Sequence, residues 1–232
     1  MNKKNKYFIR FFLLFIFVAC IVSCNKKWKK PTDVYFAFQL NSNSNNGIVK
    51  FNAASINLDK IYFNGERSQG VKSVQLSQSI TNQLIHIDTN PNSTGITFNI
   101  PQGTYSKIEI DLSIITNQNE PALNVYGTYI DTLDNDTSAI VFQLLDQQII
   151  NLIANQSGGA TQISLVAGNP VTVNIILNPN YWFELITPAL LENSNLQDVN
   201  GVETIFINAN ENVNLYNLIL NRINTNNEAV FK

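Results

Sequence analysis

Carboxylates are the side chains of this sequence best suited to catalysis. The 232-residue chain has one His and two Cys, too few for a four-ligand structural zinc site built on His and Cys, and only one possible base for a Ser-His-Asp triad. Glu109 and Asp111 lie two residues apart in a segment of alternating polarity, so both should lie on one face of a strand. A glycosidase needs two carboxylates about 5 to 9.5 Å apart across a sugar. Glu109, Asp111 and Asp131 are therefore candidates for a carbohydrate-active hydrolase; the alternative is a solvated strand face.

The densest acidic cluster, residues 131–138, could hold a cation. Asp134, Asp136 and Ser138 occupy positions one, three and five of a calcium-loop register. Calcium takes six to eight oxygen ligands, and an EF-hand loop also needs Gly at position six and Glu at position twelve. Those two positions hold an Ala and a Leu here. A solvated hairpin turn is the simpler interpretation, with calcium as the alternative.

His86 and the aromatic pair Tyr181 and Trp182 are the remaining side chains that could serve a site. His86 stands between two Ile residues in an alternating segment and is expected on the surface of a strand. Tyr181 and Trp182 could stack on sugar rings, or they could anchor a helix on the core. Residues 108–221 hold 12 acidic and no basic side chains, which is the wrong charge for binding nucleic acid.

The first 23 residues have the pattern of a signal peptide. Four basic residues precede Phe11 to Val22, an apolar run of 12 residues, whereas a membrane-spanning helix needs about 20. The run ends in Ile21-Val22-Ser23-Cys24, which resembles the lipobox of bacterial lipoproteins, where the Cys receives diacylglycerol before cleavage in front of it. Cys20 ends a poorer match, with Phe17 in place of the aliphatic residue. An ordinary signal peptide and an uncleaved anchor are the alternatives.

Cleavage before Cys24 would leave an acidic chain behind a basic tether. The remaining 209 residues carry 11 basic and 17 acidic side chains, a net charge of −6. Residues 24–30 form the tether, whose four Lys would lie near the headgroups and whose Trp28 can sit at the interface. From Pro31 onward there are seven basic and 17 acidic residues, a net charge of −10. With Cys20 removed and Cys24 acylated no disulfide is available, so the core must hold the fold.

From Pro31 the sequence predicts strands rather than helices. Short segments rich in β-branched and aromatic residues alternate in polarity and are separated by turn residues such as Asn41–Asn46 and Asn64-Gly65. The predicted strands are 33–40, 47–52, 54–63, 71–76, 83–88, 95–100, 107–115, 122–130, 138–145, 148–154, 161–166 and 171–177. This pattern predicts one mainly β domain over residues 31–232, built as an antiparallel β-sandwich.

The segment from about residue 179 to 232 changes to helical periodicity. Asn178 is expected to cap a helix over 181–191, which Pro188 should end or kink. A short strand is expected at 202–207, followed by a helix over 212–223 with Asn212 as its cap. Two short helices are therefore predicted to close the end of the sandwich.

Four segments resemble an uncharacterised family of bacterial envelope lipoproteins, common in Bacteroidota, whose domain has no known function. They are Gly47–Ile61, Ile100–Ile108, Leu123–Tyr129 and Asn178–Phe183, and residues 210–221 are similar to the terminal helix of the family. The resemblance implies a prealbumin- or immunoglobulin-like β-sandwich and no catalytic or binding residues. Surface-exported lipoproteins of such bacteria often carry acidic residues after the lipid Cys, whereas Asn25-Lys26-Lys27 is basic, which leaves the membrane face open.

Together these features lead us to expect a non-enzymatic lipoprotein of the cell envelope. It would be anchored, in the outer membrane, by acyl lipid on Cys24 and would bind a glycan or another envelope protein. No catalytic residue and no cofactor besides the covalent lipid is expected. Calcium at Asp134, Asp136 and Ser138 and a hydrolase activity of paired carboxylates are the alternatives.

The anchor can be tested by mass spectrometry. The membrane fraction should contain a chain that begins at Cys24 and carries acyl lipid, because each buried CH₂ contributes about 0.8 kcal/mol to membrane binding. Cys24→Ala should remove the lipid and release the protein, whereas Cys20→Ala should change neither. A Cys24→Ala protein that stays in the membrane fraction at the wild-type level would contradict this assignment.

Overall fold

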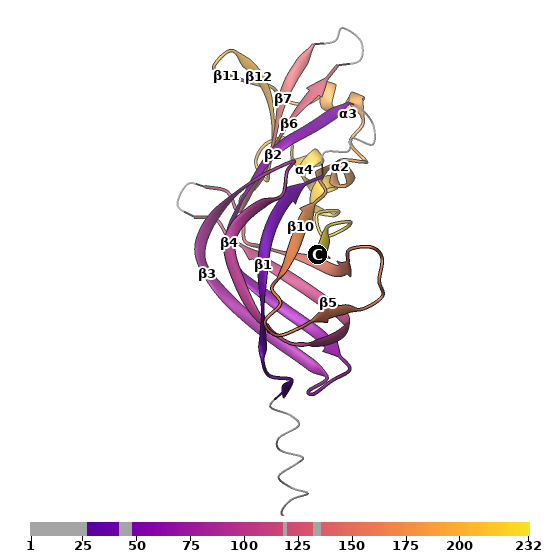
Figure 1. Ribbon diagram of the computed structural model, residues 1–232. Helices are drawn as coiled ribbons and strands as arrows, with labels where there is room; N and C mark the ends of the chain where they lie inside the picture. The colour runs from indigo at the N-terminus through magenta and orange to yellow at the C-terminus, as the bar shows by residue number, and fades with distance from the viewer. Residues whose placement is uncertain (1–26, 42–47, 118–119, 132–135) are drawn as a thin grey trace, which may run out of the picture.

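The computed structural model describes residues 27–41, 48–117, 120–131 and 136–232. The signal segment, both Cys and Asp134 lie outside these ranges, so the predictions made for them stay predictions. Within the ranges the chain forms one mixed β-sheet of 13 strands, curled into a half-barrel, with three short helices (Figure 1).

The elements are named by their order in the chain. The strands are β1 (Pro31–Leu40), β2 (Val49–Arg67), β3 (Ser73–Asp88), β4 (Asn92–Pro101), β5 (Gly103–Ile114), β6 (Leu123–Ile130), β7 (Thr137–Leu144), β8 (Gln148–Gln156), β9 (Ile163–Leu165), β10 (Val171–Leu177), β11 (Gln197–Val199), β12 (Val202–Ile207) and β13 (Glu228–Phe231). The helices are α2 (Pro179–Trp182), α3 (Pro188–Glu192) and α4 (Val213–Leu220).

The predicted antiparallel β-sandwich is wrong. Neighbouring strands follow the order β11-β12-β7-β6-β2-β5-β8-β13-β10-β1-β4, with β3 also paired to β2 and β9 to β5. Among the described strands, β1 pairs in parallel with β10, β12 with β7, and β13 with β8. Alternating polarity predicts a strand but neither its partner nor its direction. The pattern therefore could not distinguish one curled mixed sheet from two stacked antiparallel sheets.

Strand β2 joins the two parts of the sheet. Residues 49–56 pair with β6, and residues 58–67 pair with β5 on the same edge, while β3 occupies the other edge. Asn64-Gly65, expected as a hairpin turn, lies inside this strand. A Cβ at Gly65 would come within 2.6 Å of the Tyr105 ring and 2.7 Å of the Phe63 ring. Glycine is needed here for close packing and not for a turn.

A bulge near Asp59 changes which residues of β2 face the core. Before it Ile56 and Leu58 are buried at even positions, and after it Ile61 and Phe63 are buried at odd positions. The pairing with both β3 and β5 shifts its register between Leu58 and residue 60. Because one extra residue reverses the alternation of faces, the strand keeps its apolar side chains inside along both parts.

Aromatic side chains dock the helices on the sheet. Phe183, directly after α2, packs against Phe51 of β2 with ring centroids 4.7 Å apart, and Tyr216 of α4 stacks on Phe142 of β7 at 6.0 Å. Trp182 is fully buried. None of the helices in the described ranges has the length and apolar character needed to span a bilayer.

The C-terminal helices differ from the prediction in number and in their starts. The expected helix over 181–191 is split into α2 and α3, and Pro188 occupies the first turn of α3, where its missing N–H costs no hydrogen bond. Asn178 caps α2 as expected, since its side chain accepts a hydrogen bond from the Tyr181 amide. Asn212 makes no side-chain cap to α4; its amide instead donates to the carbonyls of Asn195 and Phe206.

A buried arginine closes the base of the half-barrel, where β1 begins and β2 ends. Arg67 is 5% exposed, and its guanidinium donates to the carbonyls of Val71 (2.9 Å), Trp28 (2.8 Å) and Gln102 (2.5 Å). Among the described residues no carboxylate forms an ion pair with it. Backbone carbonyls from three separate segments therefore compensate its charge, and removing it would leave them without this donor.

Tyr105 packs beside this arginine. Its ring meets Phe63 edge to face at 5.6 Å, and its hydroxyl donates to the carbonyl of Pro101 at 2.6 Å. Burial raises the pKa of the Tyr105 phenol from 10.0 to about 12, although the Arg67 charge acts in the opposite direction. The neutral phenol is therefore the form that the folded state favours.

Replacing the buried arginine should loosen the base. Arg67→Met removes all three guanidinium hydrogen bonds, and we expect the free energy of unfolding to fall by about 2 kcal/mol or more. Urea unfolding measures this change, and hydrogen exchange should show faster exchange in residues 27–31 and 101–104. Unchanged stability together with unchanged exchange would contradict the role assigned to Arg67.

Tyr105 should make the fold sensitive to alkali. The phenol of an unfolded chain ionises near pH 10, whereas the folded chain holds its proton until about pH 12. Its stabilising contribution is therefore complete below pH 10 and is lost as the pH rises to 12. The difference in unfolding free energy between the wild type and Tyr105→Phe should shrink by up to about 3 kcal/mol over this interval. A difference that is the same at pH 9 and pH 12 would contradict the assignment.

Candidate functional site

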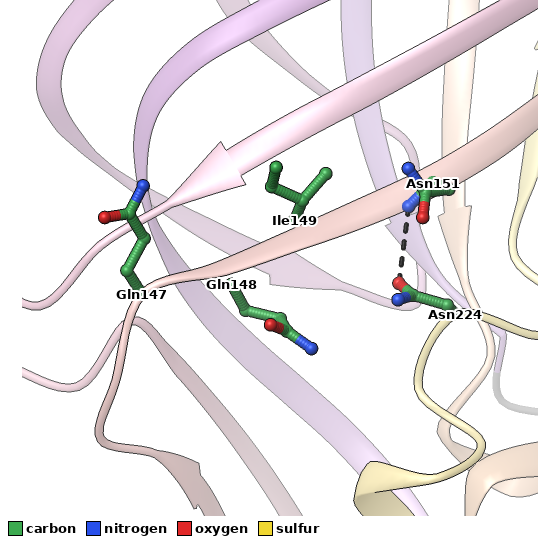
Figure 2. A pocket seen from close by; sticks show the side chains of 5 residues that line it. All are labelled: Gln147, Gln148, Ile149, Asn151 and Asn224. Carbon is green, nitrogen blue, oxygen red and sulfur yellow. Dashed lines mark hydrogen bonds between the residues drawn. The ribbon is translucent and has the colours of Figure 1, made fainter.

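An open hollow lies on the surface where β8 begins. It has a volume of about 490 Å³ and is lined by Gln147, Gln148, Ile149, Asn151 and Asn224. The first four come from β8 and the residue before it, and Asn224 comes from the segment between α4 and β13. Figure 2 shows Asn151 and Asn224 facing each other across one end of the hollow. We call this site the amide hollow.

The amide hollow is polar and carries no charge of its own. The Asn151 amide N–H donates to Asn224 Oδ1 at 3.3 Å, which fixes the orientation of that side chain. No hydrogen bond to another described residue is recorded for the side-chain amides of Gln147 and Gln148. Each carboxamide offers two N–H donors and one oxygen with two acceptor lone pairs. Four such groups beside one apolar side chain form a surface that can bind hydroxyl groups in pairs.

A row of side chains continues from the hollow across the outer face of the sheet. In the register of the strands, Tyr62 of β2 lies opposite Asp111 of β5, and Asp111 lies opposite Asn151 of β8. Asn151 Nδ2 donates to Asp111 Oδ1 at 2.9 Å. The Lys60 ammonium lies 5.6 Å from the centroid of the Tyr62 ring. Because adjacent strands are about 4.8 Å apart, this row places one carboxylate and one aromatic ring beside the amides.

The predicted carboxylate pair lies on one strand face, as expected, but each member has its own partner. Ile108, Ile110 and Leu112 are fully buried on the opposite face. Lys107 Nζ lies 2.7 Å from Glu109 Oε1, and the hydrogen bond and charge of Glu109 raise the pKa of Lys107. Asp111 is bound to Asn151. Both carboxylates are half-exposed on the open outer face, so they do not oppose each other across a substrate as glycosidase chemistry requires.

Two of the three residues of the predicted calcium loop lie within the described ranges. Asp134 lies outside the described residues, whereas Asp136 is exposed and Ser138 is half-buried at the start of β7. The Asp131 amide donates to the Asp136 carbonyl at 2.9 Å, which is the hydrogen bond of a loop that joins β6 to β7. Within the described ranges, no three His, Cys, Asp or Glu side chains come close enough together to hold a metal ion.

The remaining candidate site residues, His86, Tyr181 and Trp182, do not gather into one site. His86 is exposed on β3 opposite Ser55, as predicted for a surface position. Trp182 is fully buried and therefore serves as a core anchor. Arg222 covers the Tyr181 ring at 4.2 Å and also binds Glu184 at 2.5 Å. Neither aromatic side chain of this pair forms an open stacking platform.

A second, smaller hollow opens where β5 and β8 separate. Their pairing stops at Glu109 opposite Ile153, and beyond it residues 106–108 and 154–156 line a space of about 200 Å³ together with Thr161 and Ile163. Each of these stretches keeps a strand partner only on its other edge, β2 for the first and β13 for the second. The opening follows from the departure of β8 toward β13.

The sequence alone did not identify the amide hollow. Its residues are Asn and Gln in a chain with many amide side chains, and Asn224 is 73 residues from Asn151. The Gln147-Gln148 pair at the start of a strand has no spacing signature, so only the fold singles these amides out. Comparison of the chain with protein-family models, curated proteins and solved structures finds no significant match.

Proposed function

We propose that this protein is a lipid-anchored protein of the bacterial envelope whose β domain binds a neutral carbohydrate in the amide hollow, without catalysis. The observation that carries this proposal is the lining of the hollow by four uncharged amides, Gln147, Gln148, Asn151 and Asn224, around one exposed Ile149. Amide groups donate to and accept from neighbouring hydroxyls, and the Ile side chain can contact the apolar face of a sugar ring.

The chemistry of the lining argues against other ligand classes. Among the described lining residues there is no Lys or Arg, which disfavours phosphate and other anions. The same residues include no carboxylate, which disfavours a metal cation. Ile149 is the one apolar side chain among them, so a lipid tail would find little apolar surface. A polyhydroxylated neutral ligand fits donors and acceptors in equal supply.

Asp111 and Tyr62 extend the same proposal along the outer face. The Asp111 carboxylate, held in place by Asn151, offers a charge-assisted acceptor to a hydroxyl. Tyr62, opposite Asp111 in the register, offers a ring edge or face to the next sugar. A chain of sugars lying across β2, β5 and β8 would meet these groups in turn. The hydrolase alternative is not proposed, because Glu109 and Asp111 share one strand face and have separate partners.

The proposal predicts binding of neutral oligosaccharides without turnover. Isothermal titration with a panel of gluco-, manno-, galacto- and N-acetylglucosamine oligomers should find at least one ligand, unchanged in length after incubation. Asn224→Ala and Gln148→Ala should each weaken that binding about fivefold, the effect of one lost neutral hydrogen bond.

Asn155→Ala is the matched control, because this exposed Asn of β8 lies outside the amide hollow. It should leave the affinity unchanged. Absence of binding across the whole panel would contradict the proposal, and so would a loss in Asn155→Ala equal to that in Asn224→Ala.

A further inference from the structure

Four chain segments meet at the base of the half-barrel. They are residues 27–31 before and at the start of β1, 67–73 between β2 and β3, 101–104 between β4 and β5, and 166–170 between β9 and β10. Gln102 connects three of them, since it donates to the Lys27 carbonyl at 2.5 Å and accepts from the Ala167 amide at 3.2 Å. Arg67 adds the second segment through its bonds to Trp28 and Gln102. We call the exposed side of these segments the basal surface.

The start of the described chain is part of this folded base. The Gln102 amide donates to the Lys30 carbonyl at 2.9 Å, in addition to the bonds that Trp28 and Lys27 receive. A Cβ at Gly70 would come within 2.8 Å of the Trp28 Cβ, so the two segments pack directly on each other. The tether expected over residues 24–30 is therefore fixed to the domain from Lys27 onward, and Trp28 is held against the β2–β3 turn.

The basal surface is basic and partly apolar. Its segments carry Lys27, Lys29, Lys30 and Lys72 as exposed side chains, and the exposed acidic residues directly beside them are Asp33 and Glu66, so lysines are in excess. In two of its loops Val71 is 60% and Val166 is 50% exposed. Basic side chains that surround small exposed apolar groups complement an anionic lipid surface, which attracts the charges and admits the apolar groups between headgroups.

The opposite end of the molecule has the opposite character. Strands β6, β7, β11 and β12 contain Asp198 and Glu203 and no Lys or Arg, and Asp131 and Asp136 lie in the adjoining loop. One lysine, Lys50, is exposed at this end, opposite Thr128 of β6, so acidic side chains remain in excess. Figure 1 shows β7, β11 and β12 at the far end from the start of β1. An anionic surface therefore attracts one end of the chain and repels the other, which selects a single orientation.

We infer that the basal surface docks on an anionic phospholipid bilayer and holds the domain upright on the membrane. This inference rests on the proposed anchor, because Cys24 is four residues before Trp28 and an extended chain of that length spans at most about 14 Å. A lipid on Cys24 brings the basal lysines within one to two Debye lengths of the headgroups. Each lysine then strengthens docking about fivefold.

Hydrogen exchange on membrane-bound protein tests the docking. Acylated protein is reconstituted in vesicles of phosphatidylcholine alone and in vesicles with a third phosphatidylglycerol, and exchange is followed by mass spectrometry. Residues 68–73 and 166–170 should exchange at least about fivefold more slowly on the anionic vesicles than on the neutral ones. Residues 199–203 at the far end should exchange equally on both. Equal exchange of residues 68–73 on the two vesicle types would overturn the inference.

Two triple Lys→Gln variants distinguish docking through the basal surface from a general effect of the protein's positive charge. The triple change Lys29→Gln, Lys30→Gln and Lys72→Gln should abolish the protection of the basal loops while the protein stays bound through its lipid. The same number of lysines removed elsewhere, Lys50→Gln, Lys60→Gln and Lys232→Gln, should leave the protection intact. Equal loss of protection in both triples would also overturn the inference.

A separate measurement shows whether Cys24 is acylated. The intact mass reports whether Cys24 carries lipid, and its absence would contradict the proposed anchor without deciding the docking. In that case the chain beginning at Cys24 is coupled to a maleimide lipid through this Cys and put through the same exchange measurement. Protected basal loops on anionic vesicles would then support the docking surface even though the cell does not acylate the protein.

Discussion

The hydrogen bonds of β2 hold both parts of this sheet together, because its 19 residues are long enough to pair with β6 first and with β5 afterwards on one edge. A shorter strand would leave two sheets that could stack as a sandwich. The bulge near Asp59 lets the same strand keep its apolar side chains inside on both sides of the junction. The position of β5 is set by the point at which β2 changes partner. Because β8 pairs with β5, the same point also sets the position of the amide hollow.

Arg67 is the last residue of this strand, and its hydrogen bond to the Trp28 carbonyl fixes the beginning of the described chain relative to β2. A buried guanidinium needs acceptors, and here they are carbonyls of Val71, Trp28 and Gln102 rather than a carboxylate. Among the described residues no carboxylate neutralises its charge, so the net positive charge remains and adds to the field of the lysines around it. The interaction that orders the base thus also increases the positive potential of the surface proposed to face the membrane.

The two proposed sites use different chemistry and lie in different places. The amide hollow binds through neutral donors and acceptors, so its affinity should depend little on salt, whereas the basal surface acts through charges that salt screens. The base occupies the end of the domain at which the anchor would enter. The hollow lies beside the start of β8, which pairs with the end of β5 away from the base. Docking through the base would leave the hollow open to a glycan beside the membrane.

The sequence by itself determined that most of the chain forms strands, that Asn178 caps a helix, which face of β5 carries Glu109 and Asp111, and that charge is placed unequally. These features are local, since each depends on residues within a few positions. It also predicted a turn at Asn64-Gly65, which was wrong because a glycine required by the Tyr105 ring looks the same as a turn glycine. It divided β2 and β3 into two strands each and missed β11 and β13. The predicted sandwich was wrong because alternating polarity gives neither the partner nor the direction of a strand. Only the tertiary structure decided which strands pair, because register and partner depend on long-range burial and hydrogen bonding. For the same reason only the tertiary structure shows that Asn224 is hydrogen-bonded to Asn151 and Trp28 to Arg67.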